Sequence, residues 1–212
     1  MQLIIQELFL QYKINNLIKY LIAFFAFCVL SIALINKQEE INKFGILFSV
    51  IYIPLSFIGF THLIFKYDIE DGSLELLLSS CSAFEIVIAK FVSIFISSAI
   101  SAIINMQIIF VIFNLTTLLL IKLSLTLMLL LIPASALVIL VAAMQSYFRS
   151  NVNFLPILVM PLIIPNIIMA GITLQEDTSN LNLIMIMLGV DLVMTPCVIF
   201  LSSYLVKNIY NA

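Results

Sequence analysis

The chain has 212 residues, of which 64% are hydrophobic and only 9% are charged. A soluble domain carries roughly 25% charged residues, so this composition excludes an ordinary soluble fold. The nine Lys and Arg residues and eleven Asp and Glu residues argue against a nucleic-acid-binding surface, because neutralising phosphates requires clustered cations. The apolar residues form long continuous runs, which excludes a transmembrane barrel and predicts an all-α polytopic membrane protein.

Residues 1–19 mix apolar and polar side chains ahead of the first long apolar run. This pattern favours an amphipathic helix in the cytoplasmic membrane interface, with its apolar side in the acyl boundary. The alternative, a ragged start to the first spanning helix, stays open.

Six stretches are apolar enough to cross a bilayer, for which a helix needs about 20 residues. Charged and turn residues separate these stretches, which comprise residues 20–35, 44–65, 86–113, 123–144, 154–174 and 181–206. Since they fill most of the chain, we expect one transmembrane domain over residues 1–212.

The distribution of Lys and Arg predicts the orientation, because cationic loops are retained on the cytoplasmic side. With the N-terminus inside, the cytoplasmic segments hold six cations and the opposite side holds three. The six are Lys13, Lys19, Lys66, Lys90, Arg149 and Lys207, and the three are Lys37, Lys43 and Lys122. We therefore expect both termini in the cytoplasm.

The loop after the second expected span concentrates charge, with five of the twenty charged residues between Lys66 and Glu75. Asp71 is suited to cap a short helix, whose dipole favours acidic Glu75 in the first turn. The two sides of this helix differ, with Asp71, Glu75 and Ser79 on one and Leu74, Leu77 and Leu78 on the other. The pattern predicts a short surface helix that can dock into a soluble partner and transmit movement to the spans. A capped turn without such a role is the alternative.

The fifth expected span contains Pro156, Pro161 and Pro165. Proline removes a backbone hydrogen bond and clashes with the preceding turn, so we expect this helix to bend or break. The freed carbonyls need partners in the protein or in water, and Asn166 is a local donor. Such a helix can act as a hinge or line a substrate route, whereas a kinked packing helix is the alternative. Pro196 predicts one kink in the last span.

Asp191 is the one acidic residue clearly inside an expected span, and such groups are functional candidates because burying them in hydrocarbon is costly. No further Asp, Glu or His lies at its depth to form a proton relay. We interpret Asp191 as a protonated or hydrogen-bonded structural carboxyl, with Thr195 one turn away as its partner. His62, the single histidine, could ligate haem iron but is interpreted as an interfacial anchor.

Other recognisable chemistry is missing from the sequence. There is no G-x-x-x-x-G-K-[ST] phosphate-binding loop, so this chain cannot hydrolyse ATP by itself. Cys28, Cys81 and Cys197 lie far apart and form no zinc or haem-attachment pattern. We expect no catalytic residue, no bound metal and no enzymatic activity.

Taken together, the charged loop and the proline-rich span resemble the CcmB family, the membrane component of cytochrome c maturation called haem exporter protein B. Three runs and one proline carry the resemblance in order: Phe65, Asp68, Asp71, Gly72, Leu74, Glu75 and Leu77; Ala89-Lys90; Leu155-Pro156, Leu158-Val159, Pro161-Leu162 and Pro165; and Pro196. The chain departs from the family pattern at His62-Leu63, where members commonly carry an acidic-arginine pair. It also lacks the proline that often follows the short helix.

The resemblance implies a permease domain over residues 1–212, similar in layout to ABC-2 exporters, in a bacterial or mitochondrial inner membrane. A separate cytoplasmic ATPase, CcmA, would hydrolyse ATP, CcmC and CcmD would be membrane partners, and hydrolysis would drive release of the haem-loaded chaperone CcmE. Contacts to the ATPase would come from Asp68, Asp71, Gly72, Ser73, Leu74, Glu75, Leu77 and Leu78.

Haem is a candidate substrate of such a complex rather than a bound cofactor. The residues show no haem-ligand cluster, which favours a mechanical role for this chain. An exporter of another lipophilic compound and a scaffold without an ATPase are the alternatives.

Overall fold

The computed structural model describes residues 2–13, 19–20, 22–23, 25–27, 30, 50–52, 56, 61, 63–148, 155–175 and 181–209. Regular structure in these residues is helical throughout, which confirms the predicted all-α class. The helices are α1 (Gln2–Lys13), α4 (Leu63–Glu70), α5 (Ser73–Ser80), α6 (Ala83–Phe113), α7 (Thr117–Tyr147), α8 (Leu155–Gln175) and α9 (Leu181–Lys207). The first two predicted spans, 20–35 and 44–65, lie mostly outside the described residues, as do His62 and Cys28.

Four helices in the described part of the chain are long and apolar enough to cross a membrane: α6, α7, the Leu155–Leu174 part of α8 and the Asn182–Lys207 part of α9. They correspond to the last four predicted spans. α6 and α7 each have 31 residues and are longer than predicted. At 1.5 Å per residue each measures about 46 Å, whereas the hydrocarbon core is about 30 Å thick, so both helices can extend beyond it.

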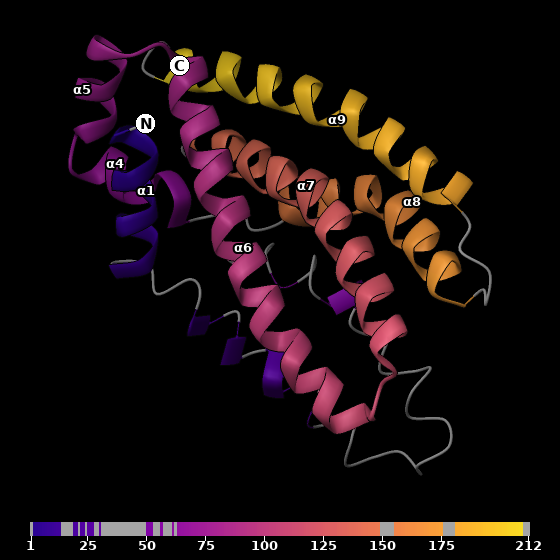
Figure 1. The fold of residues 1–212 in the computed structure, drawn as a ribbon. Helices are drawn as coiled ribbons and strands as arrows, with labels where there is room; N and C mark the ends of the chain where they lie inside the picture. Colours follow the sequence, from indigo (N-terminus) through magenta and orange to yellow (C-terminus); the bar gives the residue numbers. More distant parts are fainter. Residues whose placement is uncertain are drawn as a thin grey trace.

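The bundle is built around α7, which packs against α6, α8 and α9 (Figure 1). Nearly every side chain from Leu130 to Ala143 is buried, and a helix that is apolar all round requires such surroundings. α9 instead packs against α6 and α7 on one side and exposes large apolar residues such as Leu192 and Phe200 on the other. α7 is therefore the central helix and α9 a peripheral one.

The prolines do not break the helices that contain them. α8 is continuous from Leu155 to Gln175 through Pro161 and Pro165, and α9 is continuous through Pro196. Pro156 stands in the first turn of α8, where its missing amide would have no intrahelical acceptor. Of the expected bend or break in the fifth span, the structure excludes the break, and the bend stays a prediction.

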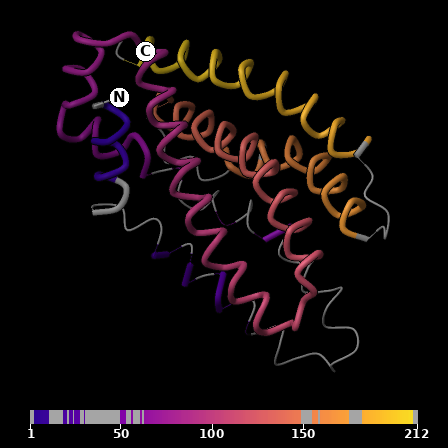
Figure 2. Tube along the Cα trace, in the orientation of Figure 1, coloured from indigo at the N-terminus to yellow at the C-terminus, as the bar shows by residue number. Residues whose placement is uncertain are grey.

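Three short helices gather at one end of the bundle. α1 packs along the first part of α6, α4 contacts α5 and α7, and α5 leads into α6. The N- and C-terminal ends of the chain both lie at this end, which is visible in the ribbon and in the tube (Figures 1 and 2). This cluster of α1, α4, α5 and the start of α6 holds the charged loop that the sequence singled out.

Candidate functional site

The turn between α4 and α5 depends on Gly72, whose φ of 71° lies in the left-handed region that favours glycine. The amide of Asp71 donates to the Tyr67 carbonyl at 2.9 Å, and the amide of Gly72 donates to the Ile69 carbonyl at 3.3 Å. These bonds satisfy two of the last four carbonyls of α4. The predicted cap by Asp71 is not formed: Gly72 precedes α5, and no side chain caps that helix.

α5 has a buried side and an exposed side. Leu74 is fully buried and Leu77 and Leu78 are half-buried. The opposite side exposes the acidic residue Glu75, and Asp71 is exposed just before the helix. Leu76 is also 72% exposed, so the outer surface of α5 is both acidic and apolar.

The start of α6 is held by a reciprocal cap. The Ser82 hydroxyl accepts from the Glu85 amide at 3.3 Å, and Glu85 Oε2 accepts from the Ser82 amide at 2.9 Å. The Cys81 amide donates to the Leu77 carbonyl at the end of α5. Only two residues therefore separate α5 from α6, and their backbone is hydrogen-bonded.

A buried ion cluster, which we call the Lys90 triad, joins α1, α4 and α6. The Lys90 ammonium lies 2.9 Å from Glu7 Oε1 and 2.5 Å from Asp68 Oδ2. It also donates to the Ile64 carbonyl at 3.3 Å and lies 5.1 Å from the centre of the Phe65 ring. All three charged residues are buried. The ammonium is fully hydrogen-bonded, which a buried ion requires.

The triad carries one positive and two negative formal charges, so it has a net charge of −1. Burial raises the pKa of the Glu7 carboxyl above its ordinary 4.5, and the neighbouring Lys90 ammonium opposes that rise.

Lys90 stands seven residues, about 10 Å, from the start of α6. Because α6 is longer than the hydrocarbon core is thick, the triad can lie near the interface rather than at mid-membrane.

Asp68 also links the triad to α5. The hydroxyl of Ser73, the first residue of α5, donates to the carboxylate and to the carbonyl of Asp68, both at 3.4 Å. Asp68 is only 8% exposed. Of the predicted ATPase contacts, the structure thus places Asp68 and Leu74 inside the protein and Asp71 and Glu75 on its surface.

Sequence reasoning missed Glu7 and the pairing of Lys90. Glu7 is the one acidic residue in an otherwise uncharged stretch of α1, and Lys90 lies inside an apolar run. A charged residue within an apolar run needs an oppositely charged partner nearby. The position of Lys90 in such a run therefore indicated that a partner exists. It could not name the partner, because Glu7 and Lys90 are 83 positions apart.

A second polar cluster, which we call the Asn166–Asp191 pair, joins α8 and α9. Asn166 Nδ2 donates to Asp191 Oδ1 at 2.7 Å, and both side chains are buried. The expected bond between Asp191 and Thr195 is absent. Three oxygens, Thr195 Oγ1, Asp191 Oδ2 and Asn166 Oδ1, have no hydrogen-bond partner among the described residues. The packing of α8 on α9 brings Asn166 within hydrogen-bonding distance of Asp191.

The structure places the predicted hinge or pathway residues on α8 and α9, with different degrees of exposure. Pro161, Pro165 and Pro196 are exposed, and Pro156 is buried. Pro156 lines a cavity of about 10 Å³ with Leu137 and Val141 of α7. That space is at most one water molecule, whereas ligand pockets measure about 300–1,000 Å³. Within the described residues, no cluster of three or more His, Cys, Asp or Glu side chains could hold a metal.

Comparison with known proteins places the chain in one family. The model of the family described as CcmB protein matches residues 1–207. An uncharacterised protein of Rickettsia conorii is 52% identical over 209 residues, covering 99% of this chain and 96% of that protein. An uncharacterised protein of Rickettsia prowazekii is 47% identical over the same length, with the same coverage. With its apolar spanning helices and this match over nearly its full length, the chain is a membrane protein that belongs to the CcmB family.

Proposed function

We propose that this chain is the permease subunit of an ABC-type complex for cytochrome c maturation. A CcmA-like cytoplasmic ATPase would bind α5 and hydrolyse ATP, and CcmC-like and CcmD-like membrane proteins would complete the complex. ATP hydrolysis would drive release of a haem-loaded, CcmE-like chaperone on the opposite side of the membrane. The membrane would be a bacterial inner membrane, with both chain termini on the ATPase side.

The observation that carries this proposal is the division of α5 into a held side and an exposed side. Its inner side is fixed by Leu74 in the core and by Ser73 on Asp68, while Glu75 and Leu76 face outward. A helix that offers an acidic and apolar surface, and is tied to longer helices behind it, suits a partner that pushes or pulls.

Movement of α5 would reach the spans by two routes. One is the two-residue connection from α5 to α6 through Cys81 and Ser82. The other passes from Ser73 to Asp68 and from Asp68 to Lys90, inside α6. Both routes end on α6, which packs directly on α7 and α9. The proposed action is mechanical and requires no haem ligand from this chain.

The test is charge reversal on the exposed side of α5. Asp71→Lys combined with Glu75→Lys should abolish co-purification of the co-expressed ABC ATPase and block haem attachment to c-type cytochromes. Lys122→Glu, a charge reversal at the far end of α6 and α7, is the matched control and should leave both intact. An ATPase that still co-purified with the double variant would contradict docking on α5.

Deleting the gene separates this function from its alternatives. Loss of haem attachment to c-type cytochromes is expected, whereas intact attachment would favour export of another lipophilic compound. A chain that binds no ATPase, yet is still needed for cytochrome assembly, would instead be a scaffold.

A further inference from the structure

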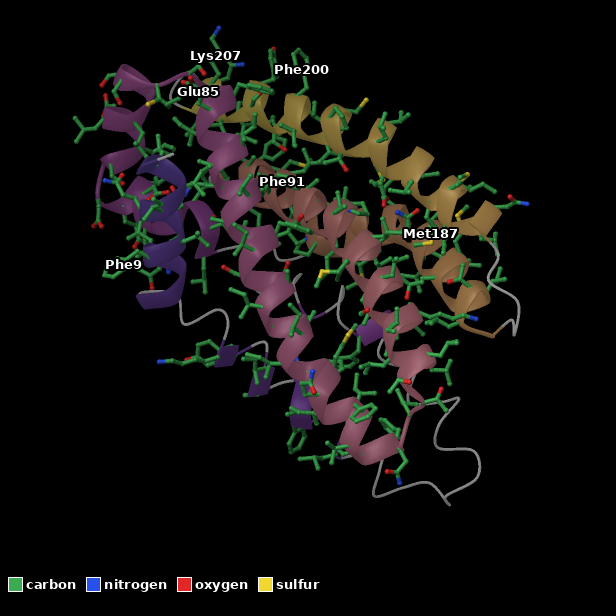
Figure 3. The ribbon with its side chains drawn as sticks, in the orientation of Figure 1. Phe9, Glu85, Phe91, Met187, Phe200 and Lys207 are labelled. Atoms are coloured by element: carbon green, nitrogen blue, oxygen red, sulfur yellow. The ribbon has the colours of Figure 1, made fainter. Side chains whose placement is uncertain are left out.

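The contact between α8 and α9 contains a buried amide and a buried carboxyl. On α9, buried residues recur at four-residue spacing at Met187, Asp191 and Thr195. Figure 3 shows Met187 on the side of α9 toward α8 and Phe200 on the side away from the bundle. Asn166 of α8 meets this buried side through its hydrogen bond to Asp191. A polar contact is therefore enclosed between two helices that are otherwise mostly apolar.

The Asn166 amide and the Asp191 carboxyl are planar groups with two polar atoms each. One atom of each is already joined, because Asn166 Nδ2 donates to Asp191 Oδ1 at 2.7 Å. The other two atoms, Asn166 Oδ1 and Asp191 Oδ2, have no hydrogen-bond partner among the described residues. Both are acceptors when the carboxyl is ionised. One proton on Oδ2 makes that atom a donor, so the same two groups can then form a second hydrogen bond.

A proton suits this position better than a water molecule or a divalent cation. Asn166 is 1% exposed and Asp191 is 3% exposed, and their unpaired oxygens are out of contact with solvent. A buried water needs space of its own and two to four polar partners. Magnesium and calcium ions need about six oxygen ligands, whereas only these two oxygens and Thr195 Oγ1 are unpaired in the described part of this contact. A proton requires neither additional space nor further ligands.

The surrounding charges offer no other way to neutralise Asp191. α8 contains no titratable residue, and no ion pair among the described residues includes Asp191. An ionised carboxylate without a cation is costly in hydrocarbon, and protonation removes that cost. The titratable residues of the helices that pack against α8 and α9, and of α9 itself, are Glu85 and Lys90 of α6, Lys122 and Tyr147 of α7, and Cys197, Tyr204 and Lys207 of α9.

We propose that Asp191 is a proton-binding site and that its proton locks α8 to α9. A proton taken from water adds to Oδ2, and the resulting O–H donates to Asn166 Oδ1. The acid and the amide are then joined by two hydrogen bonds in a closed ring. When the proton returns to water, one bond remains and the carboxylate is charged, so the contact between the helices weakens. This inference does not depend on the proposed function, because it requires neither the ATPase nor haem.

Thr195 and two prolines suit the unlocked state. The hydroxyl of Thr173 on α8 donates to a carbonyl of its own helix, which is usual for a helical threonine, whereas the hydroxyl of Thr195 has no partner among the described residues. It lies one turn from Asp191 and can donate to the carboxylate once the amide of α8 withdraws. Pro165 and Pro196 adjoin the two halves of the cluster, and each removes a backbone hydrogen bond, so both helices can bend there.

Infrared spectroscopy of the full-length chain in liposomes tests the proton. Isotopic labelling of the Asp carboxyl carbons identifies their bands, and Asp191→Asn shows which band belongs to Asp191. We expect the carbonyl band of a protonated carboxyl at neutral pH. Asn166→Leu should shift this band to higher frequency, because both hydrogen bonds are lost. Thr173→Val is the matched control and should leave the band unchanged, because the Thr173 hydroxyl bonds only within α8.

Two results of this experiment would overturn the inference. An Asp191 that is ionised at neutral pH would contradict the proton site. A protonated band that keeps its frequency in Asn166→Leu would contradict the pairing with Asn166.

A distance measurement tests the lock itself. Spin labels are placed on the outer sides of the two helices, at Ile168 of α8 and Leu188 of α9, in a chain whose native cysteines are replaced. The distribution of distances between the labels should broaden in alkaline buffer, where the proton is lost. Asp191→Asn should keep the narrow distribution, because its amide can form both bonds at any pH. Equal broadening in both proteins, or broadening in neither, would overturn the link between the proton and the helix contact.

Discussion

The Lys90 triad and the Asn166–Asp191 pair are both buried, but their polar atoms differ in how completely they are hydrogen-bonded. In the triad a single ammonium contacts two carboxylates and a carbonyl. In the pair one hydrogen bond is formed, and three oxygens in or beside it have no partner among the described residues. The triad therefore depends on its charges, whereas the pair can be satisfied by neutral groups.

Their positions along the helices agree with this difference. Lys90 is about 10 Å from the start of α6, and Asp191 is about 15 Å from the start of α9 and further from its end. A compensated ion cluster is tolerable near the interface, where water is close. The free-energy cost of burying a charge is greatest at mid-membrane, so a neutral hydrogen-bonded pair is less costly there than an ion.

The largest effect is expected from Lys90→Met, which leaves two buried carboxylates facing each other. Breaking a buried ion pair in this way should lower the free energy of unfolding by about 3–5 kcal/mol. Denaturant titration of the purified protein in detergent measures the change. The neutral triple variant Glu7→Gln, Asp68→Asn and Lys90→Met should recover most of the loss. Full stability of Lys90→Met alone would show that the triad is not held by charge.

A smaller effect is expected at the Asn166–Asp191 pair. Asp191→Asn preserves an acceptor for Asn166, so stability should change by less than about 1 kcal/mol. Asp191→Leu removes the acceptor and should cost about 0.6 kcal/mol, the average for a hydrogen bond between membrane helices, and at most about 1.7 kcal/mol. The same titration compares the two variants. A severe loss in Asp191→Asn would mean that Asp191 acts as an ion, as the triad does.

The smallest effect concerns the docking of α1 at different pH values. The pKa of Glu7 is raised by burial, so the protonated carboxyl favours the docked helix. This stabilisation is fully present below pH 4.5 and is lost as the pH rises through the raised pKa. Amide hydrogen exchange in α1, corrected for intrinsic rates, should therefore show more protection at pH 5 than at pH 8. Glu7→Gln should remove the dependence, and a dependence that persisted would assign it to another group.

The sequence predicted what periodicity and composition determine. The last four spans, the amphipathic character of α5 and the family all followed from local patterns, because each depends on neighbouring residues. Asp68 shows the limit of such patterns: it lies in a charged loop and looks like a surface residue, yet tertiary packing encloses it with Lys90. Asn166 and Asp191 show the same limit, since each was assigned a local partner and each instead contacts the other.

Pro161 and Pro165 show a related limit, because α8 continues through both of them. A proline cancels one hydrogen bond, but it does not determine whether the rest of the helix continues. α8 is held by its packing against α7 and α9, and this support is invisible in a single sequence. The propensity of one residue is a weak predictor wherever long helices pack side by side.

The short turns around α5 have a consequence for how force travels. The Gly72 turn and the Ser82 cap leave no slack residues between α4, α5 and α6, and their backbone amides are hydrogen-bonded on both sides. A flexible linker would absorb a displacement by changing its own shape. Here the connections are too short and too well bonded for that, so a push on α5 has to tilt or shift α6. The stiffness of these two short turns would then determine how efficiently conformational changes of the ATPase are converted into movement of the spanning helices.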